Sequence, residues 1–406
     1  MKICVITKEL YPFRYDGIGV QAYNQALLLA QNGHEVSWLS QVHTNYDESR
    51  AAALYPGISL EFFNYEPEKF LSHKPLDYAV QAEEAFARLH AQKRFDAILT
   101  FDFEAECFCI CKKRLTEKMY SDLKIIVTLE GPAREVARVN HGLGTTPWGD
   151  AVFEAEDFSL LMSDAVISCS QYLWEQVNAR LPLSGKPAKV IPNMCRLDLF
   201  KVRGKEFPPC ERGLPPLREI IFVGRLEKRK GADLLLMAFL DLLREYPRAL
   251  DYKLVFVGRD LFWDDLHASF IENYLPKIPE DLRDRFEFCG QLSHQDVALR
   301  LQKAVFGVFP SRWEPFGIAA LEALSSGVPV IVSRGTGLDE IVGKDYPFLF
   351  DLKQGVPGLK DLLRRLIAAE DQWASLSDLA TGIAKEVNRK SREDFLEFLL
   401  TVDRRE

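Results

Sequence analysis

The feature that most constrains the fold is a repeated alternation of short apolar strand patterns with longer helical patterns. Each apolar run is almost continuous, which is typical of parallel strands covered by helices on both faces. A first series of strand runs lies at 2–7, 35–40, 96–101, 125–129, 165–170 and 189–192, with a helix over about 17–32. A second series lies at 219–224, 253–258, 286–290, 305–310 and 328–333, with helices over about 231–246 and from about 316. The pattern therefore predicts an α/β protein with two doubly wound, parallel-sheet domains that face each other across a cleft.

The two series are separated by residues 196–218, a segment rich in proline, glycine and charge. Its turn-forming residues are Pro208, Pro209, Pro215, Pro216, Gly204 and Gly213. This composition predicts a hinge linker. Near the end of the chain, apolar residues at helical spacing over 391–402 predict a terminal helix.

Composition narrows the class of protein. The chain has 406 residues, 47% of them hydrophobic and 27% charged, which fits a folded globular protein of two or three domains. The net charge of −8 argues against general nucleic-acid binding. Eight cysteines are too sparse for a disulfide scaffold, no apolar run approaches a membrane span, and no leader pattern opens the sequence. We expect a soluble, cytoplasmic protein with reduced thiols.

The first glycine motif, Gly17-Ile18-Gly19, follows the first strand pattern and opens a helix. The motif resembles a dinucleotide fingerprint, but nine residues separate the strand from Gly17, and the second strand lacks the acid that would hold a ribose diol. What remains is a glycine-rich helix N-terminus whose amides suit an anion. The alternative is a pair of turn glycines that only lets the chain enter the helix.

A second motif lies at the carboxyl edge of the second predicted sheet. Gly224-Arg225 ends a strand pattern, and Lys230-Gly231 opens the next helix. A guanidinium fork beside an ammonium suits a diphosphate, and open α/β sheets bind their ligands at this edge. Lys228 and Arg229 are interpreted as solvated neighbours, and an exposed basic loop is the alternative for the whole cluster.

A third motif follows the strand pattern at 305–310. Pro315 is interpreted as a first-turn proline, so that Phe316 and Gly317 supply backbone amides at a helix N-terminus. Glu314 and Glu322 are carboxylates, which only accept hydrogen bonds. We therefore expect Glu314 to hold hexose hydroxyls and Glu322 to hold a ribose diol.

Together these motifs resemble the retaining, nucleotide-sugar-dependent glycosyltransferases of the GT-B fold, family four, in its glycogen-synthase-like and phosphatidylinositol-mannosyltransferase-like group. The resemblance covers nearly the whole chain. It rests on the order and spacing of the motifs above and of the following fragments: Gly33-His34-Glu35-Val36, Ser170, Ile191-Pro192-Asn193, Asp198, Phe200, Gly327-Val328-Pro329-Val330 and Gly337-x-x-Glu340.

The resemblance implies a division of labour between the domains. Residues 1–199 would form the acceptor-binding Rossmann-like domain, completed by the helix at 389–406, and residues 200–388 would form the donor-binding one. The donor-binding residues that it implies are Gly17, Gly19, Gly224, Arg225, Lys230, Glu314, Phe316, Gly317 and Glu322. It also implies a catalytic role for Glu314, Arg225 and Lys230, and a reaction without metal or other cofactor. The absence of a D-x-D motif agrees with this.

The sequence departs from the family after the strand at 125–129. Relatives usually carry a histidine there, whereas this chain has Glu130. Glu130 could accept a hydrogen bond from a donor hydroxyl and stabilise a developing oxocarbenium charge, which is the favoured reading. It could instead point away, or act as a covalent nucleophile. His141 is considered as a substitute, but a loop histidine is more often solvated.

Two further groups have simpler explanations. Cys107, Cys109 and Cys111 lack a second pair at zinc spacing, so buried small hydrophobes are favoured over a metal site. The run Lys112-Lys113-Arg114 could touch an anionic lipid headgroup, but residues 1–195 carry a net charge of −6, which favours a solvated helix face and at most peripheral membrane association.

The sequence thus predicts an enzyme that moves a hexose from a nucleoside diphosphate sugar to an acceptor hydroxyl with retention of configuration. The acceptor, which could be a sugar, glycan, small molecule or glycolipid, would contact the loops at 8–20, 43–75 and 130–150. The alternative is a non-catalytic sugar-nucleotide-binding relative, made possible by the change at Glu130. A sugar-nucleotide epimerase has no support from the motifs of the second domain.

Overall fold

The computed structural model describes residues 1–14, 16–71, 73–140, 147–183, 185–202, 217–261 and 268–403. The core of the predicted hinge linker, residues 203–216, lies outside the described residues, as does His141. The chain divides into two compact units. One comprises Met1–Arg138, Leu143–Met194 and Lys390–Glu406, and the other comprises Val139–Gly142 and Cys195–Arg389.

The first unit is built on a parallel sheet of seven strands in the order β3-β2-β1-β4-β5-β6-β7. The strands are β1 (Lys2–Ile6), β2 (Glu35–Gln41), β3 (Ile58–Phe63), β4 (Ala97–Phe101), β5 (Lys124–Leu129), β6 (Ala165–Ser168) and β7 (Ala188–Val190). Every residue of β4 is buried, as expected for a strand covered on both faces. The strand order reverses between β1 and β4, and open α/β sheets bind ligands at the carboxyl ends of such a pair.

The second unit contains a parallel sheet of six strands in the order β10-β9-β8-β11-β12-β13. The strands are β8 (Arg218–Val223), β9 (Tyr252–Val257), β10 (Phe286–Phe288), β11 (Ala304–Phe309), β12 (Val330–Ser333) and β13 (Leu349–Phe350). Its order reverses between β8 and β11. The predicted pair of doubly wound parallel α/β units is therefore confirmed.

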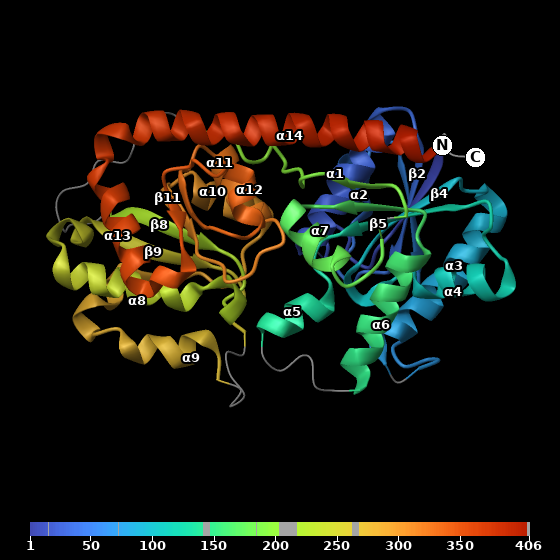
Figure 1. Ribbon diagram of the computed structural model, residues 1–406, viewed down its shortest axis with the longest axis horizontal. Coiled ribbons are helices and arrows are strands. Elements are labelled where there is room, and N and C mark those ends of the chain that lie inside the picture. Colours follow the sequence, from blue (N-terminus) through green and yellow to red (C-terminus); the bar gives the residue numbers. More distant parts are fainter. Residues whose placement is uncertain are drawn as a thin grey trace. The chain divides into compact units, whose positions relative to one another are not determined.

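Helices connect and cover the strands of each unit (Figure 1). The first unit contains α1 (Gly17–Gln31), α2 (Glu48–Leu54), α3 (Lys74–Lys93), α4 (Phe108–Glu117), α5 (Ala133–Val139), α6 (Pro147–Met162) and α7 (Gln171–Asn178). The second contains α8 (Ala232–Glu245), α9 (Phe270–Tyr274), α10 (His294–Leu301), α11 (Ile318–Ser325), α12 (Gly337–Val342) and α13 (Gly355–Ala368). Helix α4 packs against both α3 and α6, and α8 packs against α13.

The final helix, α14, runs over Trp373–Asp403 and is the long red helix in Figure 1. It is much longer than the helix predicted over 391–402. Its residues up to Arg389 group with the second unit and those from Lys390 with the first. Lys189 at β7 forms ion pairs of 2.8 Å with both Asp394 and Glu397 of this helix. The last turns of α14 are thus tied to the sheet of the first unit.

Three further details of the fold differ from the sequence prediction. Strands β3 and β13 were not predicted, because β3 is only partly buried and β13 has two residues. Lys113 and Arg114 do not form a solvated face, since they pair with Glu83 at 2.5 Å and with Asp164 at 2.6 Å. The third difference, the start of α11, belongs to the candidate site and is described with it.

Two of the three cysteines of the C-x-C-x-C run behave as buried small residues, and the third, Cys109, is half-buried. Cys107 and Cys111 are both fully buried, and their sulfur atoms lie 3.9 Å apart as free thiols. No helix within the described parts of the chain combines the length and the apolar character needed to cross a membrane.

Candidate functional site

The candidate site of the second unit lies where β8 and β11 end side by side. Strand β8 runs into Gly224 and Arg225, and a short turn then leads to Lys230. Strand β11 runs into Ser311 and Glu314. Because β8 and β11 are adjacent parallel strands at the point where the strand order reverses, both segments reach the same edge of the sheet.

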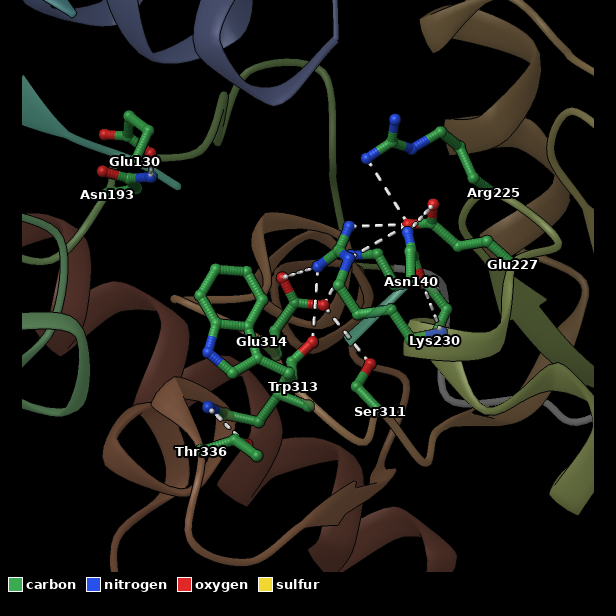
Figure 2. Close-up of polar contacts among 12 residues, drawn as sticks. Glu130, Asn140, Asn193, Arg225, Glu227, Lys230, Ser311, Trp313, Glu314 and Thr336 are labelled. Carbon is green, nitrogen blue, oxygen red and sulfur yellow. Dashed lines mark hydrogen bonds and ion pairs between the residues drawn. The ribbon is translucent and has the colours of Figure 1, made fainter. Parts of the chain in front are cut away.

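The centre of this site is an ion pair between Lys230 and Glu314 (Figure 2). Lys230 Nζ lies 2.5 Å from Glu314 Oε2, and the Ser311 hydroxyl donates to the same oxygen at 3.3 Å. Arg229 Nη1 lies 3.8 Å from the other carboxylate oxygen. Burial acts to raise the pKa of Glu314, but Lys230 and Arg229 outweigh burial and hold this pKa below its usual value. Glu314 is therefore a carboxylate that accepts hydrogen bonds at neutral pH.

Arg229, interpreted from the sequence as a solvated neighbour, is instead buried in the site. Its guanidinium pairs with Glu227 at 2.7 Å and donates to the backbone oxygen of Trp313 at 3.3 Å. Asn140 joins this group, since its side chain donates to Glu227 at 2.9 Å and accepts from the backbone N–H of Arg229 at 3.1 Å. The sequence missed this network, because alternating charges in a loop are usually solvated.

Arg225 is held more loosely than the two other cations of the site. Its guanidinium lies 3.4 Å from Glu227, and 39% of its side chain is exposed, compared with 20% for Lys230 and 5% for Arg229. The site thus contains three cations and two carboxylates, which leaves an excess of positive charge at the sheet edge. Such an excess, with one partly exposed guanidinium, suits a multiply charged anion.

Glycines allow the chain segments of the site to approach each other closely. Gly231 adopts a left-handed conformation at φ 71°, and a Cβ at this position would lie 2.1 Å from the backbone oxygen of Pro310. Gly317 has φ 102° and is the N-cap of α11. A Cβ there would lie 2.2 Å from Leu338. Both turns therefore require glycine.

The prediction that Pro315 opens a helix is wrong. Helix α11 begins at Ile318, so Pro315 and Phe316 precede the N-cap Gly317. The left-handed Gly317 separates them from the helix. Phe316 is buried, and its backbone belongs to the loop that carries Glu314. The backbone N–H of Gly337, at the start of α12, donates to the Glu314 carbonyl at 2.8 Å and holds this loop in place.

Glu322 lies on α11 and is hydrogen-bonded to a residue that the sequence did not single out. His294, the first residue of α10, places its Nε2 atom 2.6 Å from Glu322 Oε1. Both side chains are buried, and the Phe200 ring packs edge-on against the imidazole at 4.8 Å. A histidine 28 residues away in sequence carries no local signal that it contacts Glu322.

In the first unit, Glu130 lies directly after β5, next to the strand pair where the order reverses. The amide of Asn193 donates to Glu130 Oε2 at 2.5 Å. The Asp102 carboxylate, at the end of β4, accepts from the backbone N–H groups of Glu130 and Gly131 at 3.0 and 3.1 Å. Burial raises the pKa of Glu130 well above its usual value. The sequence indicated Glu130 but missed the contributions of Asn193 and Asp102.

The amino-terminal glycine motif is placed at the start of α1, as the sequence predicts. The amide of Gly19, expected to bind phosphate, donates to Glu9 Oε2 at 2.7 Å. The same oxygen accepts from the Asp16 N–H at 2.8 Å. Gly17 is exposed and a Cβ there would contact nothing within 4 Å. In this structure the Gly19 amide is therefore already hydrogen-bonded to a carboxylate of the same chain.

Within the described residues, no group of three or more histidine, cysteine, aspartate or glutamate side chains is arranged to hold a metal ion. The acids of the second-unit site face cations instead. Glu314 pairs with Lys230, and Glu227 pairs with Arg229. This donor set favours an anionic ligand that is neutralised by side-chain cations.

Comparison with known families gives two matches along the chain. The family model "Glycosyltransferase Family 4" matches residues 15–199, and the model "Glycosyl transferases group 1" matches residues 215–380. Among curated proteins, the chain is 27% identical to spore coat protein SA of Bacillus subtilis over 53% of this chain and 59% of that protein. It is 23% identical to glycogen synthase of Mycobacterium tuberculosis over 90% of this chain and 86% of that one.

Solved structures share the fold over the whole chain. The sucrose-phosphate synthase of Thermosynechococcus elongatus superposes with a TM-score of 0.72 at 20% identity, covering 99% of this chain and 98% of the other. Anabaena HepE, solved in complex with UDP and glucose, superposes with a TM-score of 0.64 at 17% identity, covering 98% and 99%. These likenesses show the fold.

Proposed function

We propose that this chain, which belongs to the family 4 glycosyltransferases of the GT-B fold, moves a hexose from a nucleoside diphosphate sugar to an acceptor hydroxyl with retention of the anomeric configuration. Sugar transfer by enzymes of this family depends on a nucleotide-sugar donor. The observation that supports a donor site in the second unit is the Lys230–Glu314 ion pair beside the half-exposed Arg225.

The cations would bind the donor diphosphate. Arg225 is exposed enough to swing onto a phosphate and offer two parallel N–H donors, while Lys230 adds a point charge. Arg229 is already committed to Glu227 and would hold the loop in place. The charge of these side chains would take the role that a metal ion has in other transferases, so we propose a metal-independent reaction.

The carboxylates would bind the sugar hydroxyls of the donor. Glu314, kept ionised by Lys230 and Arg229, can only accept, and hexose hydroxyls are donors that match it. One carboxylate oxygen of Glu322 would accept a hydrogen bond from the ribose diol, while His294 holds the other oxygen, Oε1. The UDP and glucose bound by the structural neighbour HepE support a ligand of this class.

The reaction would draw on the same groups. Departure of the diphosphate leaves negative charge on its oxygens, which Arg225 and Lys230 would stabilise more strongly in the transition state than in the bound donor. The leaving diphosphate would help to deprotonate the acceptor hydroxyl, so that attack on the same face retains the configuration.

The experiment that tests this proposal is incubation of the protein with UDP-, GDP- and ADP-hexoses while free nucleoside diphosphate is measured. We expect slow hydrolysis of one donor even without an acceptor, and faster release with a panel of sugar, phosphosugar and glycolipid acceptors. A donor that binds and raises the melting temperature but is never consumed, with any acceptor, would contradict transfer.

A further inference from the structure

Glu130 and Asn193 form a hydrogen-bonded side-chain pair in which each residue keeps one oxygen without a partner among the described residues. Both belong to the first unit, and Figure 2 shows the carboxyl and amide groups facing each other end to end. The Asn193 amide donates to Glu130 Oε2 at 2.5 Å. Glu130 Oε1 and Asn193 Oδ1 are both buried, and neither has a hydrogen-bond partner among the described residues.

An ionised Glu130 leaves this pair with two unsatisfied oxygens. A carboxylate has no donor, and the oxygen of an amide is also only an acceptor. Each buried acceptor without a partner has lost its hydrogen bond to water without a replacement, which destabilises the ionised form. Turning the Asn193 amide over would move its donor to the other carboxyl oxygen and leave the first one unsatisfied. Reorienting the amide therefore does not solve the problem.

A proton on Glu130 Oε1 does solve it. The neutral acid would donate through Oε1 to Asn193 Oδ1, while the Asn193 amide continues to donate to Oε2. Acid and amide would then close a ring of two complementary hydrogen bonds, and both orphaned oxygens would gain a partner.

The surroundings of Glu130 also favour the neutral form. Asp102 faces it from the end of β4, and Glu9 faces it from the loop after β1. Burial, with these two acids, raises the pKa of Glu130. The amide donor of Asn193 by itself lowers this pKa, whereas its buried Oδ1 is an acceptor that only a protonated Glu130 can satisfy. Lys8, the cation of the neighbouring loop, is paired with Glu104. Glu156, on α6, is a further acid near Asp102.

We propose that Glu130 is a neutral carboxylic acid at physiological pH, and that Asn193 is a positioning residue which selects this protonation state and fixes the orientation of the acid. The sequence led us to expect a carboxylate whose charge stabilises an oxocarbenium ion. A neutral acid offers a hydrogen bond without a charge, and it is not a nucleophile, so a covalent glycosyl intermediate on Glu130 is excluded by the same inference. Only this mechanistic consequence rests on the proposed function.

Infrared difference spectroscopy of the whole protein tests the protonation state directly. Glu130→Gln keeps both hydrogen bonds of the pair, because its amide donates to Asn193 Oδ1 and its oxygen accepts from the Asn193 amide. The spectrum of wild type minus Glu130→Gln at pH 7 should contain the carbonyl band of a protonated acid, and this band should shift in D₂O. Carboxylate bands in its place would overturn the proposal.

The carbonyl band of the protonated acid also tests the role of Asn193. In Asn193→Ala the ring of hydrogen bonds is broken, so the acid band of Glu130 should move in frequency and titrate at a changed pH. Circular dichroism confirms that the variant is folded, and Glu130→Gln/Asn193→Ala provides the blank spectrum. A band that keeps its frequency and titration in Asn193→Ala would show that Asn193 does not select the neutral form.

The consequence for the reaction is tested separately by turnover. Glu130→Gln, a mimic of the neutral acid, should retain more turnover than Glu130→Ala and should lose the decline of activity at high pH that ionisation of Glu130 causes. A loss of about 10²-fold or more at pH 7 would mean that the charge is needed. If wild type transfers no sugar from any donor, the proposed function fails, but the infrared result still decides the protonation state.

Discussion

At the scale of single residues, the account depends on which cation of the second-unit site is committed and which is available. Lys230 pairs closely with Glu314, whereas Arg225 is more exposed and lies farther from its partner Glu227. The two residues are therefore expected to differ in what they contribute. Arg225 would serve the ligand alone, and Lys230 would serve both the ligand and the fold.

Replacing these two cations should separate affinity from stability. Arg225→Ala and Lys230→Ala should each weaken nucleoside diphosphate binding by ~1.5–3 kcal/mol, about 10- to 150-fold in Kd, in calorimetric titration. Lys230→Ala should also lower the unfolding free energy by about 1–3 kcal/mol, because the buried Glu314 then keeps only the more distant cation Arg229 and the Ser311 hydroxyl. Arg364→Ala, which removes an exposed arginine from α13, is the matched control and should change neither quantity. Unchanged affinity in both site variants would mean that the phosphates bind elsewhere.

Glu130 should also make the stability of the protein depend on pH. Its pKa in the folded state is raised above the ordinary value of 4.5. Its contribution to stability is therefore complete below pH 4.5 and is lost as the pH rises toward the folded pKa, with a slope of up to about 1.4 kcal/mol per pH unit. Asp102, with a pKa raised to about 6, titrates in the same range. The comparison of wild type with Glu130→Gln isolates Glu130, and melting temperatures should fall less steeply with pH in the variant. Parallel curves would indicate an ordinary pKa for Glu130.

At the scale of elements, the sequence predicted most strands, because parallel strands buried on both faces are continuous apolar runs. The strand β3 escaped notice, since a partly buried edge strand lacks that signature. The motifs at Gly224, Lys230 and Glu314 were found because they follow strands whose ends are recognisable. The contacts of Arg229, His294 and Asn193 were not predicted, although Arg229 and Asn193 stand in the motifs, because these contacts join distant segments.

The start of α11 shows the limit of local rules. A proline is common in the first turn of a helix, and Pro315 fitted that rule. Gly317 adopts a left-handed conformation at φ 102°, and α11 begins only at Ile318. The local rule for Pro315 could not reveal this, because it takes no account of the left-handed turn two residues later.

The turn at Gly231 offers a test at this scale. Gly231→Ala places a Cβ against the Pro310 backbone and in a left-handed conformation, so it should destabilise the second unit by about 1–3 kcal/mol and weaken nucleotide binding. Gly382→Ala in α14 is the control, because a Cβ there contacts nothing within 4 Å. It should raise stability by about 0.5–1 kcal/mol. Chemical denaturation of both variants checks the pair, and equal effects would contradict the close approach at Gly231.

At the scale of the whole molecule, the chain consists of two units that each have their own sheet and core. The sequence predicted a boundary between 199 and 200 and assigned 389–406 to the first domain. The compact units divide between Met194 and Cys195 and between Arg389 and Lys390. The short segment Val139–Gly142, which includes Asn140, groups with the second unit although its neighbours belong to the first. No sequence pattern indicated that this segment groups with the second unit, because the grouping depends on the hydrogen bonds of Asn140 to Glu227 and Arg229.

Ligand binding should therefore protect the units unequally. With a saturating nucleoside diphosphate, hydrogen exchange should slow in peptides covering 224–231 and 310–322 of the second unit, because their amides and side chains would hold the ligand. Peptides of the first-unit sheet, such as 35–41, serve as the internal control. Protection in the first unit without any in the second would contradict a donor site in the second unit.

The most direct test of the central claim is the stereochemistry of the transfer itself. The donor identified by the nucleotide-sugar panel is incubated with an acceptor, and the anomeric proton of the product is followed by NMR in wild type, Lys230→Ala and Arg364→Ala. The account predicts that the product keeps the anomeric configuration of the donor, that Lys230→Ala forms it at least about 10²-fold more slowly, and that Arg364→Ala matches wild type. A product of inverted configuration, or full activity in Lys230→Ala, would contradict it.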